Sequence, residues 1–234
     1  VDIILVGDSV GTAVLGYPDT ISVTIEDMIH HVRAVARGSE RCLIVGDMPF
    51  GSVQIGGSRA RKDAVALMRA GSHAVKLEGA HRTELIRDLV DNGIPVMGHI
   101  GLTPQSIHRF GGYKVQGRSR DERAALVDAA VQLEAAGVFA VVIECVPPEA
   151  AAMVTHALSV PTIGIGAGPS VGGQVLVLHD ALGMNPDFKA RFVRQFCNGF
   201  EVLSEAVRSF CAEVRCRNYP GPEHVYKDES PCSQ

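Results

Sequence analysis

The chain has 234 residues, of which 46% are hydrophobic and 21% are charged, and its net charge is -4 at pH 7. This composition is typical of a globular protein with ample apolar material for a core. No basic stripe favours nucleic-acid binding, and no apolar run reaches the roughly 18 residues of a membrane-spanning helix. We therefore expect neither nucleic acid nor a membrane as a partner.

The strands expected from short β-branched runs cover residues 3–6, 42–45, 74–78, 95–97, 140–143, 161–164 and 174–178. The helices expected between and after them cover residues 24–37, 59–70, 82–92, 121–136, 148–158 and 188–214. Thr24 and Asp27 resemble a capping box at the start of the first helix. Residues 100–118 are rich in Gly and Pro and are expected to form a long functional loop.

This alternation of strands and helices predicts parallel βαβ units, and strands that are apolar on both faces predict a sheet covered by helices. No linker divides the seven expected strands, so we expect one domain over residues 1–234. A (β/α)8 barrel that lacks its first strand in this chain fits better than a doubly wound sheet. C-terminal helices at about 187–215 and an extended tail at 216–234 would complete it.

The six cysteines do not form the framework of a small disulfide-stapled domain, and Cys211, Cys216 and Cys232 lack the spacing of a metal site. Reduced thiols are therefore expected, which favours a cytoplasmic location. A mitochondrial location is the alternative, because the sequence begins inside an apolar run without an initiator Met and a presequence could precede it.

Five expected strands end in a side chain suited to chemistry: Asp8, Asp47, Glu78, His99 and Glu144. A single acid at a strand end is more often a helix cap or a turn residue. In a barrel, however, the carboxyl ends of the strands converge on the active site. Five such side chains in phase therefore indicate a site.

Asp8, Asp47 and Glu78 offer only hard oxygen ligands, which suits Mg²⁺, although Mn²⁺ would also fit. A hydrogen-bonded carboxylate cluster without metal is the alternative, but three adjacent acids would repel one another. Lys76 shares a strand face with Glu78, because side chains two positions apart point the same way. It could bind a substrate carboxylate or oxyanion, or form a salt bridge with Glu78.

Glu144 follows an apolar run, so we expect a raised pKa and a role as general base; capping the helix near Pro148 is the alternative. His99 could orient a substrate or be a barrel histidine with satisfied hydrogen bonds. Ser9 could bind a substrate carboxylate or only form a turn. Arg118 and Arg120 could bind an anionic cofactor tail, but solvated arginines are the favoured interpretation.

Several segments carry a family resemblance, in chain order: VGDS at 6–9, GDMPF at 46–50, VKLEG at 75–79, GHIGLTPQS at 98–106, FGGYKVQG at 110–117, ECVP at 144–147, IGIGAG at 163–168 and YPGPEH at 219–224. They resemble ketopantoate hydroxymethyltransferases over essentially the whole chain. The resemblance implies a (β/α)8 barrel of the phosphoenolpyruvate/pyruvate type and a homo-oligomer, a decamer. The family carries an N-terminal helix and a first barrel strand before the VGDS motif, and this sequence begins without them.

The resemblance also implies a reaction. A hydroxymethyl group would pass from 5,10-methylenetetrahydrofolate to 3-methyl-2-oxobutanoate through a Mg²⁺-stabilised enolate, the first committed step toward pantothenate. The implied roles are Mg²⁺ binding by Asp8, Asp47 and Glu78, oxo-acid binding by Asp8, Ser9, Asp47 and Lys76, with His99 as a further substrate contact, and proton abstraction by Glu144. The alternatives are another Mg²⁺-dependent C–C lyase or mutase of the same barrel superfamily, and an inactive subunit that acts as a scaffold.

Overall fold

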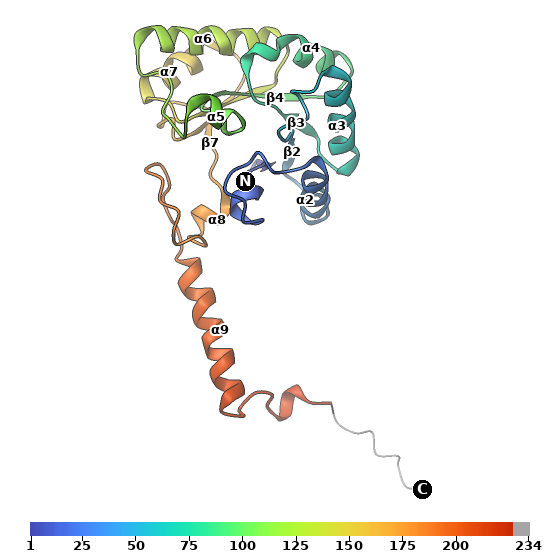
Figure 1. The fold of residues 1–234 in the computed structure, drawn as a ribbon, viewed down its shortest axis with the longest axis vertical. Helices are drawn as coiled ribbons and strands as arrows, with labels where there is room; N and C mark the ends of the chain where they lie inside the picture. Colours follow the sequence, from blue (N-terminus) through green and yellow to red (C-terminus); the bar gives the residue numbers. More distant parts are fainter. Residues whose placement is uncertain (227–234) are drawn as a thin grey trace. The chain divides into compact units, whose positions relative to one another are not determined.

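A computed structural model describes residues 1–226 of the chain (Figure 1). By their internal contacts, residues 1–177 form one compact unit and the segment that begins at Leu178 forms a second. The first unit contains the whole sheet and the candidate site. No helix among residues 1–226 is both long and apolar enough to cross a membrane.

Seven parallel strands pair in chain order: β1 (Ile3–Val6), β2 (Leu43–Asp47), β3 (Ala74–Lys76), β4 (Val96–Gly101), β5 (Ala140–Glu144), β6 (Thr162–Ile165) and β7 (Gly173–Gln174). Within residues 1–226, β1 pairs only with β2 and β7 only with β6, so the sheet has two edges. Parallel neighbours need crossover connections, and helices provide most of them. The predicted α/β architecture of parallel βαβ units is confirmed.

The helices of the first unit are α1 (Val10–Ala13), α2 (Ile25–Gly38), α3 (Gly57–Ala70), α4 (Thr83–Asp91), α5 (Ile107–Phe110), α6 (Arg120–Ala135) and α7 (Pro148–Ala157), with short 3-10 helices η1 (Ala80–Arg82) and η2 (Pro104–Ser106). The longer helices pack along the outside of the sheet (Figure 1). The capping box predicted for α2 is confirmed, because Thr24 accepts a hydrogen bond from the Asp27 amide and Asp27 accepts one from the Thr24 amide.

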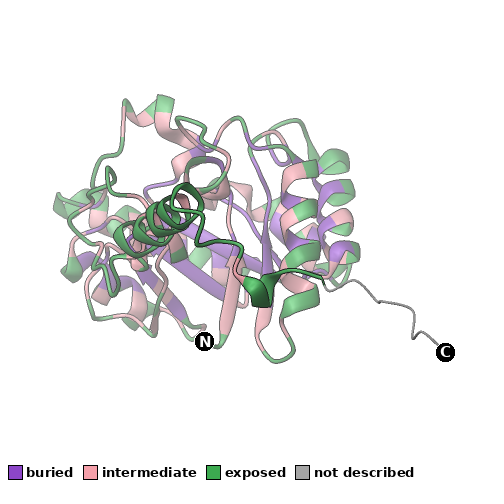
Figure 2. Cartoon of the chain, turned by 90° about the horizontal axis from the view of Figure 1, so that it is seen from below, coloured by how far each residue is buried: buried purple, intermediate pink, exposed green. Residues whose placement is uncertain are grey.

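The residues of the central strands β2–β5 are mostly buried, and these strands are largely purple in Figure 2, whereas the edge strands β1 and β7 are mostly only partly buried. A large apolar cluster fills the space between the strands and the helices. A smaller cluster lies on the opposite face of the strands and consists of Val45, Ala74, Met97, Ala140 and Val142. We call this smaller cluster the interior core.

Several predicted elements differ in the structure. The strand expected at 74–78 ends at Lys76, and the strand expected at 95–97 continues to Gly101, so that His99 lies within it. The strand expected at 174–178 is only Gly173–Gln174, and residues 178–181 instead form a short helix. The expected loop at 100–118 contains η2 and α5. Pro104 begins η2, where a missing amide costs nothing, and Gly111 ends α5 with a φ of 65°.

The second unit contains α8 (Leu178–Ala181), α9 (Gly199–Arg215) and η3 (Pro222–His224). Residues 182–198 form no helix, so helical structure begins later than the expected start at 188. The large apolar side chains of α9 are exposed: Phe200, Val202, Leu203, Val207, Phe210 and Val214. The last part of the expected tail, residues 227–234, lies outside the described residues.

Candidate active site

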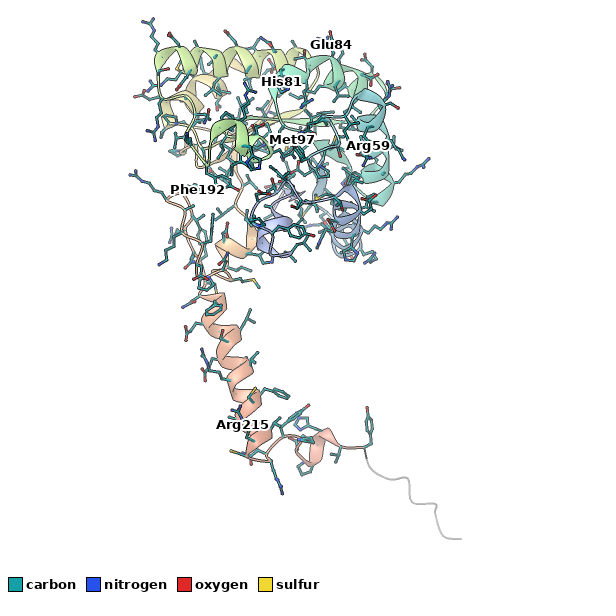
Figure 3. The ribbon with its side chains drawn as sticks, in the orientation of Figure 1. Arg59, His81, Glu84, Met97, Phe192 and Arg215 are labelled. Carbon is teal, nitrogen blue, oxygen red and sulfur yellow. The ribbon has the colours of Figure 1, made fainter. Side chains whose placement is uncertain are left out.

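The candidate site continues the interior face of the strands at their carboxyl ends. Asp47 lies two positions after Val45 of the interior core, and His99 lies two positions after Met97, which Figure 3 labels. Side chains two apart in a strand share a face, so these polar groups stand at the end of an apolar interior. Lys76, at the end of β3, follows the same rule.

Lys76 is the central cation of this site and is only 4% exposed. Its Nζ lies 2.8 Å from Oδ1 of Asp47 and 3.9 Å from Oε1 of Glu78. The expected pairing with Glu78 is therefore present, but Asp47 is the closer partner, because β2 and β3 place Asp47 beside Lys76 in register. Burial opposes the charge of Lys76, but the carboxylates of Asp47, Glu78 and Asp8 outweigh it and raise the lysine pKa.

Gln105 of η2 joins two of the acids and was not among the predicted site residues. Its backbone amide donates to Oε2 of Glu78 at 3.1 Å, and its side-chain Nε2 donates to Oδ2 of Asp8 and to the carbonyl of Met48, both at 2.9 Å. The side chain is buried. The signals in the sequence were its place in the Gly/Pro-rich segment that follows His99 and in the GHIGLTPQS segment at 98–106.

The three acids carry more negative charge than Lys76 balances. Burial raises the pKa of Asp8 well above its usual value, and repulsion from Asp47 and Glu78 adds to this effect. Burial also raises the pKa of Asp47, although Lys76 opposes the rise. Burial acts the same way on Glu78, but contacts with His99, Lys76 and the Gln105 amide prevail and lower its pKa. The surroundings thus favour the ionised form of Glu78 and disfavour that of Asp8 most strongly among the three acids.

His99 connects this cluster to Glu144. Its Nδ1 lies 3.5 Å from Oε1 of Glu78, and its Nε2 lies 3.2 Å from Oε2 of Glu144. Burial and Lys76 oppose a charge on the imidazole, but Glu144 and Glu78 outweigh them and raise the pKa of His99 to about 9. Glu144 is the more accessible acid, with 17% of its side chain exposed against 4% for Glu78.

The structure thus links most of the predicted side chains in one cluster: Asp47, Lys76, Glu78, His99 and Glu144. Asp8 joins this cluster through its backbone amide, which donates to Asp47, and through the side chain of Gln105. The predicted Ser9 is the N-cap residue of α1, directly after Asp8, and its side chain makes no capping hydrogen bond. Its hydroxyl is therefore not committed to the helix that it begins.

The carboxylate oxygens of the three acids are the type of ligand that a hard cation prefers. Asp8, Asp47 and Glu78 present only oxygen, and their negative charge is in excess. Oε1 of Glu78 is buried and accepts no hydrogen bond among residues 1–226, although Lys76 and His99 lie near it. In that part of the chain, no three His, Cys, Asp or Glu side chains already converge as a coordination sphere. Lys76 and Gln105 contact the carboxylates instead.

Sequence comparison identifies close relatives of this chain. It is 50% identical over 228 residues to 3-methyl-2-oxobutanoate hydroxymethyltransferase of Syntrophomonas wolfei, covering 97% of this chain and 83% of the relative. The enzyme of the same name from Thermotoga maritima is 49% identical, with coverage of 98% and 86%. The one from Ignicoccus hospitalis is 50% identical, with coverage of 97% and 86%.

Solved structures with the same fold are much more distant in sequence. Phosphoenolpyruvate phosphomutase from Streptomyces platensis has a TM-score of 0.57 and 13% identity, covering 97% of this chain and 80% of that protein. For 2,3-dimethylmalate lyase, a member of the PEP mutase/isocitrate lyase superfamily, the TM-score is 0.51 and the identity 18%, with coverage of 98% and 80%. These similarities show that the chain has the (β/α) barrel type of fold that these enzymes have.

The family match spans nearly all of the described chain. Residues 1–222 match ketopantoate hydroxymethyltransferase. Together with relatives at about half identity, matched over 83% and 86% of their length, this match is decisive. The chain therefore belongs to the ketopantoate hydroxymethyltransferase family.

Proposed function

We propose that this chain transfers a hydroxymethyl group from 5,10-methylenetetrahydrofolate to 3-methyl-2-oxobutanoate, giving 2-dehydropantoate and tetrahydrofolate, the step that leads to pantothenate. Family membership supports the reaction. The observation that carries it is that His99 contacts both Glu144 and Glu78, and so connects Glu144 to the buried cluster of Lys76 and carboxylates. A base therefore lies beside a site that can stabilise an anion.

Mg²⁺ is the proposed metal, held by Asp8, Asp47 and Glu78. When bound, it would supply positive charge to the keto and carboxylate oxygens of the oxo acid. The all-oxygen donor set and the excess negative charge at Asp8 support this assignment. In addition, phosphonopyruvate hydrolase, whose fold matches with a TM-score of 0.56 at 13% identity, was solved with oxalate and Mg²⁺.

The chain's own residues divide the remaining work. Lys76 binds the oxo-acid oxygens and stabilises the negative charge that develops on them, and Ser9 donates a hydrogen bond to the substrate carboxylate. Glu144 removes the proton from C3, and His99 holds its carboxylate in place. The electron pair left at C3 forms the bond to the methylene carbon of the co-substrate while one of the two C–N bonds of that carbon breaks, and the freed nitrogen takes up a proton in place of the one removed from C3. Water then replaces the second nitrogen on the same carbon: its hydroxyl group stays on the product, its proton goes to the nitrogen, and tetrahydrofolate leaves.

Replacement of Glu144 tests the proton step. With Mg²⁺ and oxo acid deuterated at C3, Glu144→Gln should slow exchange of the C3 hydron with solvent by about 100-fold or more, because a general base is lost. The measurement is exchange followed by NMR. Glu149→Gln is the matched control, because Glu149 lies on α7 with 76% of its side chain exposed. Exchange at the wild-type rate in Glu144→Gln would exclude Glu144 as the base.

We also propose that the chain assembles with copies of itself, as a decamer by family resemblance, and that it works in the cytoplasm. The exposed apolar side chains of α9 support assembly, since single-chain surfaces rarely leave so many apolar groups on one element. The bacterial and archaeal origin of the relatives supports the cytoplasmic assignment.

A further inference from the structure

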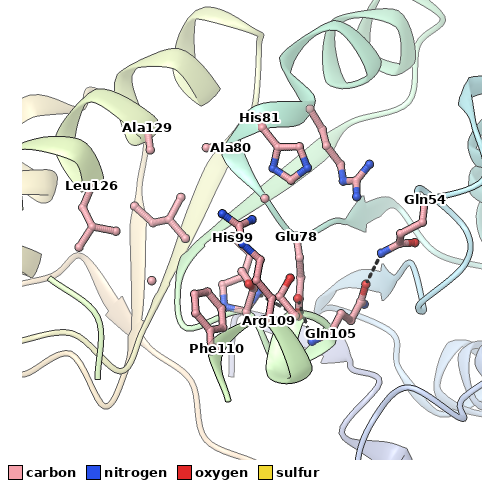
Figure 4. A pocket seen from close by; sticks show the side chains of 16 residues that line it. Gln54, Glu78, Ala80, His81, His99, Gln105, Arg109, Phe110, Leu126 and Ala129 are labelled. Carbon is pink, nitrogen blue, oxygen red and sulfur yellow. Dashed lines mark hydrogen bonds and ion pairs between the residues drawn. The ribbon is translucent and has the colours of Figure 1, made fainter. Parts of the chain in front are cut away.

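A cavity of about 170 Å³ lies beside the carboxylate cluster and shares Glu78, His99 and Gln105 with it (Figure 4). Phe110 of α5 and Leu126 of α6 give it an apolar wall. The mechanism proposed above uses Glu78 and His99 but assigns nothing to the rest of this space.

Basic side chains gather on this cavity: His81, Arg82 and Arg109. Arg82 is half-buried, and its Nη1 donates to the carbonyl of Val53 at 2.8 Å, which fixes the guanidinium. Its Nε is buried without a hydrogen-bond partner in the described chain. Within residues 1–226, neither Arg82 nor Arg109 forms an ion pair.

These bases lie close enough together to affect one another. Burial lowers the pKa of His81, and the positive charges of Arg82 and Arg109 lower it further. Glu78 is the sole acid among the lining residues, and Lys76, His99 and the Gln105 amide already engage it. Cations gathered without a counter-charge are stabilised when an anion binds between them.

We propose that this cavity is a subsite for a carboxylate, bound by Arg82 and Arg109. The planar guanidinium suits a carboxylate, because its N–H donors match the two oxygens. Arg118 and Arg120, which the sequence pattern suggested for an anionic cofactor tail, do not line the cavity.

The identity of the ligand that carries this carboxylate is inferred from the proposed function. The oxo-acid carboxylate goes to Lys76, so the glutamyl tail of tetrahydrofolate is the other carboxylate that the reaction brings. Its aminobenzoyl ring would pack against Phe110 and Leu126, which provide an aromatic and an aliphatic surface. A free dicarboxylate is the other possible source of the same chemistry.

Equilibrium binding measured by calorimetry tests the subsite without requiring turnover. The ligands are tetrahydrofolate, the primary amide of tetrahydropteroate, which carries no carboxylate, and glutarate. Arg109→Gln should weaken tetrahydrofolate binding about 10-fold, the effect of losing one charge-assisted hydrogen bond, and leave binding of the amide unchanged. Arg87→Gln should bind every ligand like wild type, because Arg87 is exposed on α4 and does not line the cavity.

Each outcome has one meaning. Weaker binding of tetrahydrofolate alone supports the subsite with the tail as its ligand, and weaker binding of glutarate alone supports it with a free dicarboxylate. Unchanged affinities for all three ligands in Arg109→Gln overturn the subsite, even if the wild type forms tetrahydrofolate from the proposed substrates. If the wild type forms no tetrahydrofolate from the proposed substrates, the proposed function is refuted. If Arg109→Gln nevertheless weakens the binding of glutarate, the subsite is still supported.

Discussion

At the scale of single residues, Gln105 joins Glu78 to Asp8, which lies 97 residues before Gln105 in the chain. Its buried side chain satisfies the carboxylate of Asp8 and the carbonyl of Met48, while its backbone amide fixes Glu78. A buried acceptor that loses its donor costs about 1–3 kcal/mol, so this one amide matters to both stability and site geometry.

Gln105→Ala should therefore lower the free energy of unfolding by about 2 kcal/mol, since Asp8 and Met48 would each lose a buried donor. Urea denaturation measures the change. Gln132→Ala is the matched control, because Gln132 is exposed on α6 and surface changes of this kind stay within about 0.5 kcal/mol. Equal stabilities of the two variants would contradict the role of Gln105.

At the scale of elements, the path of the chain at the end of β4 determines the position of η2 and therefore of Gln105. Gly101 has a φ of 88°, and a Cβ at this position would clash with the carbonyl oxygen of Glu144. Leu102 donates a hydrogen bond to the same oxygen at 2.9 Å. The chain therefore leaves β4 in close contact with β5, and only glycine permits that approach.

Gly101→Ala should destabilise the protein by at least about 2 kcal/mol, because it adds a backbone clash to a conformation that costs other residues about 1–3 kcal/mol. The measurement is again urea denaturation. Gly38→Ala provides the comparison, because Gly38 lies in α2 and an added Cβ there meets no atom within 4 Å. A Gly101→Ala protein as stable as Gly38→Ala would show that the strand exit is not constrained.

At the scale of the whole molecule, α9 presents Phe200, Leu203, Val207, Phe210 and Val214, whose spacing of three or four residues puts them on one helical stripe. Burying such a stripe is worth about 25 cal/mol for each Å² removed from water. Contact with another copy of the chain would supply that burial.

The double variant Leu203→Asp with Val207→Asp should therefore shift the protein to smaller assemblies, as measured by light scattering during size-exclusion chromatography. Ser209→Asp should leave the assembly mass unchanged, because Ser209 is exposed and lies away from that stripe. An unchanged mass for the double variant would show that α9 is not an assembly surface.

Local sequence information was sufficient for the βα alternation, the strand-end acids and the helix cap at Thr24. These features follow from hydrophobic period and backbone chemistry over a few residues. The strand at 174–178 was wrong beyond Gln174, because apolar residues alone do not show where pairing with a neighbouring strand ends. Both regular elements in the 100–118 segment were missed, because each is only one short turn.

The sequence by itself determined the fold class, the family and which side chains stand at the strand ends. Only the tertiary structure decided that Lys76 lies closer to Asp47 than to Glu78, that Gln105 joins Asp8 to Glu78, and that Arg82 and Arg109 share a cavity. The physical reason is that strand periodicity is local, whereas the partner of a buried charge depends on register between strands and on loops distant in sequence.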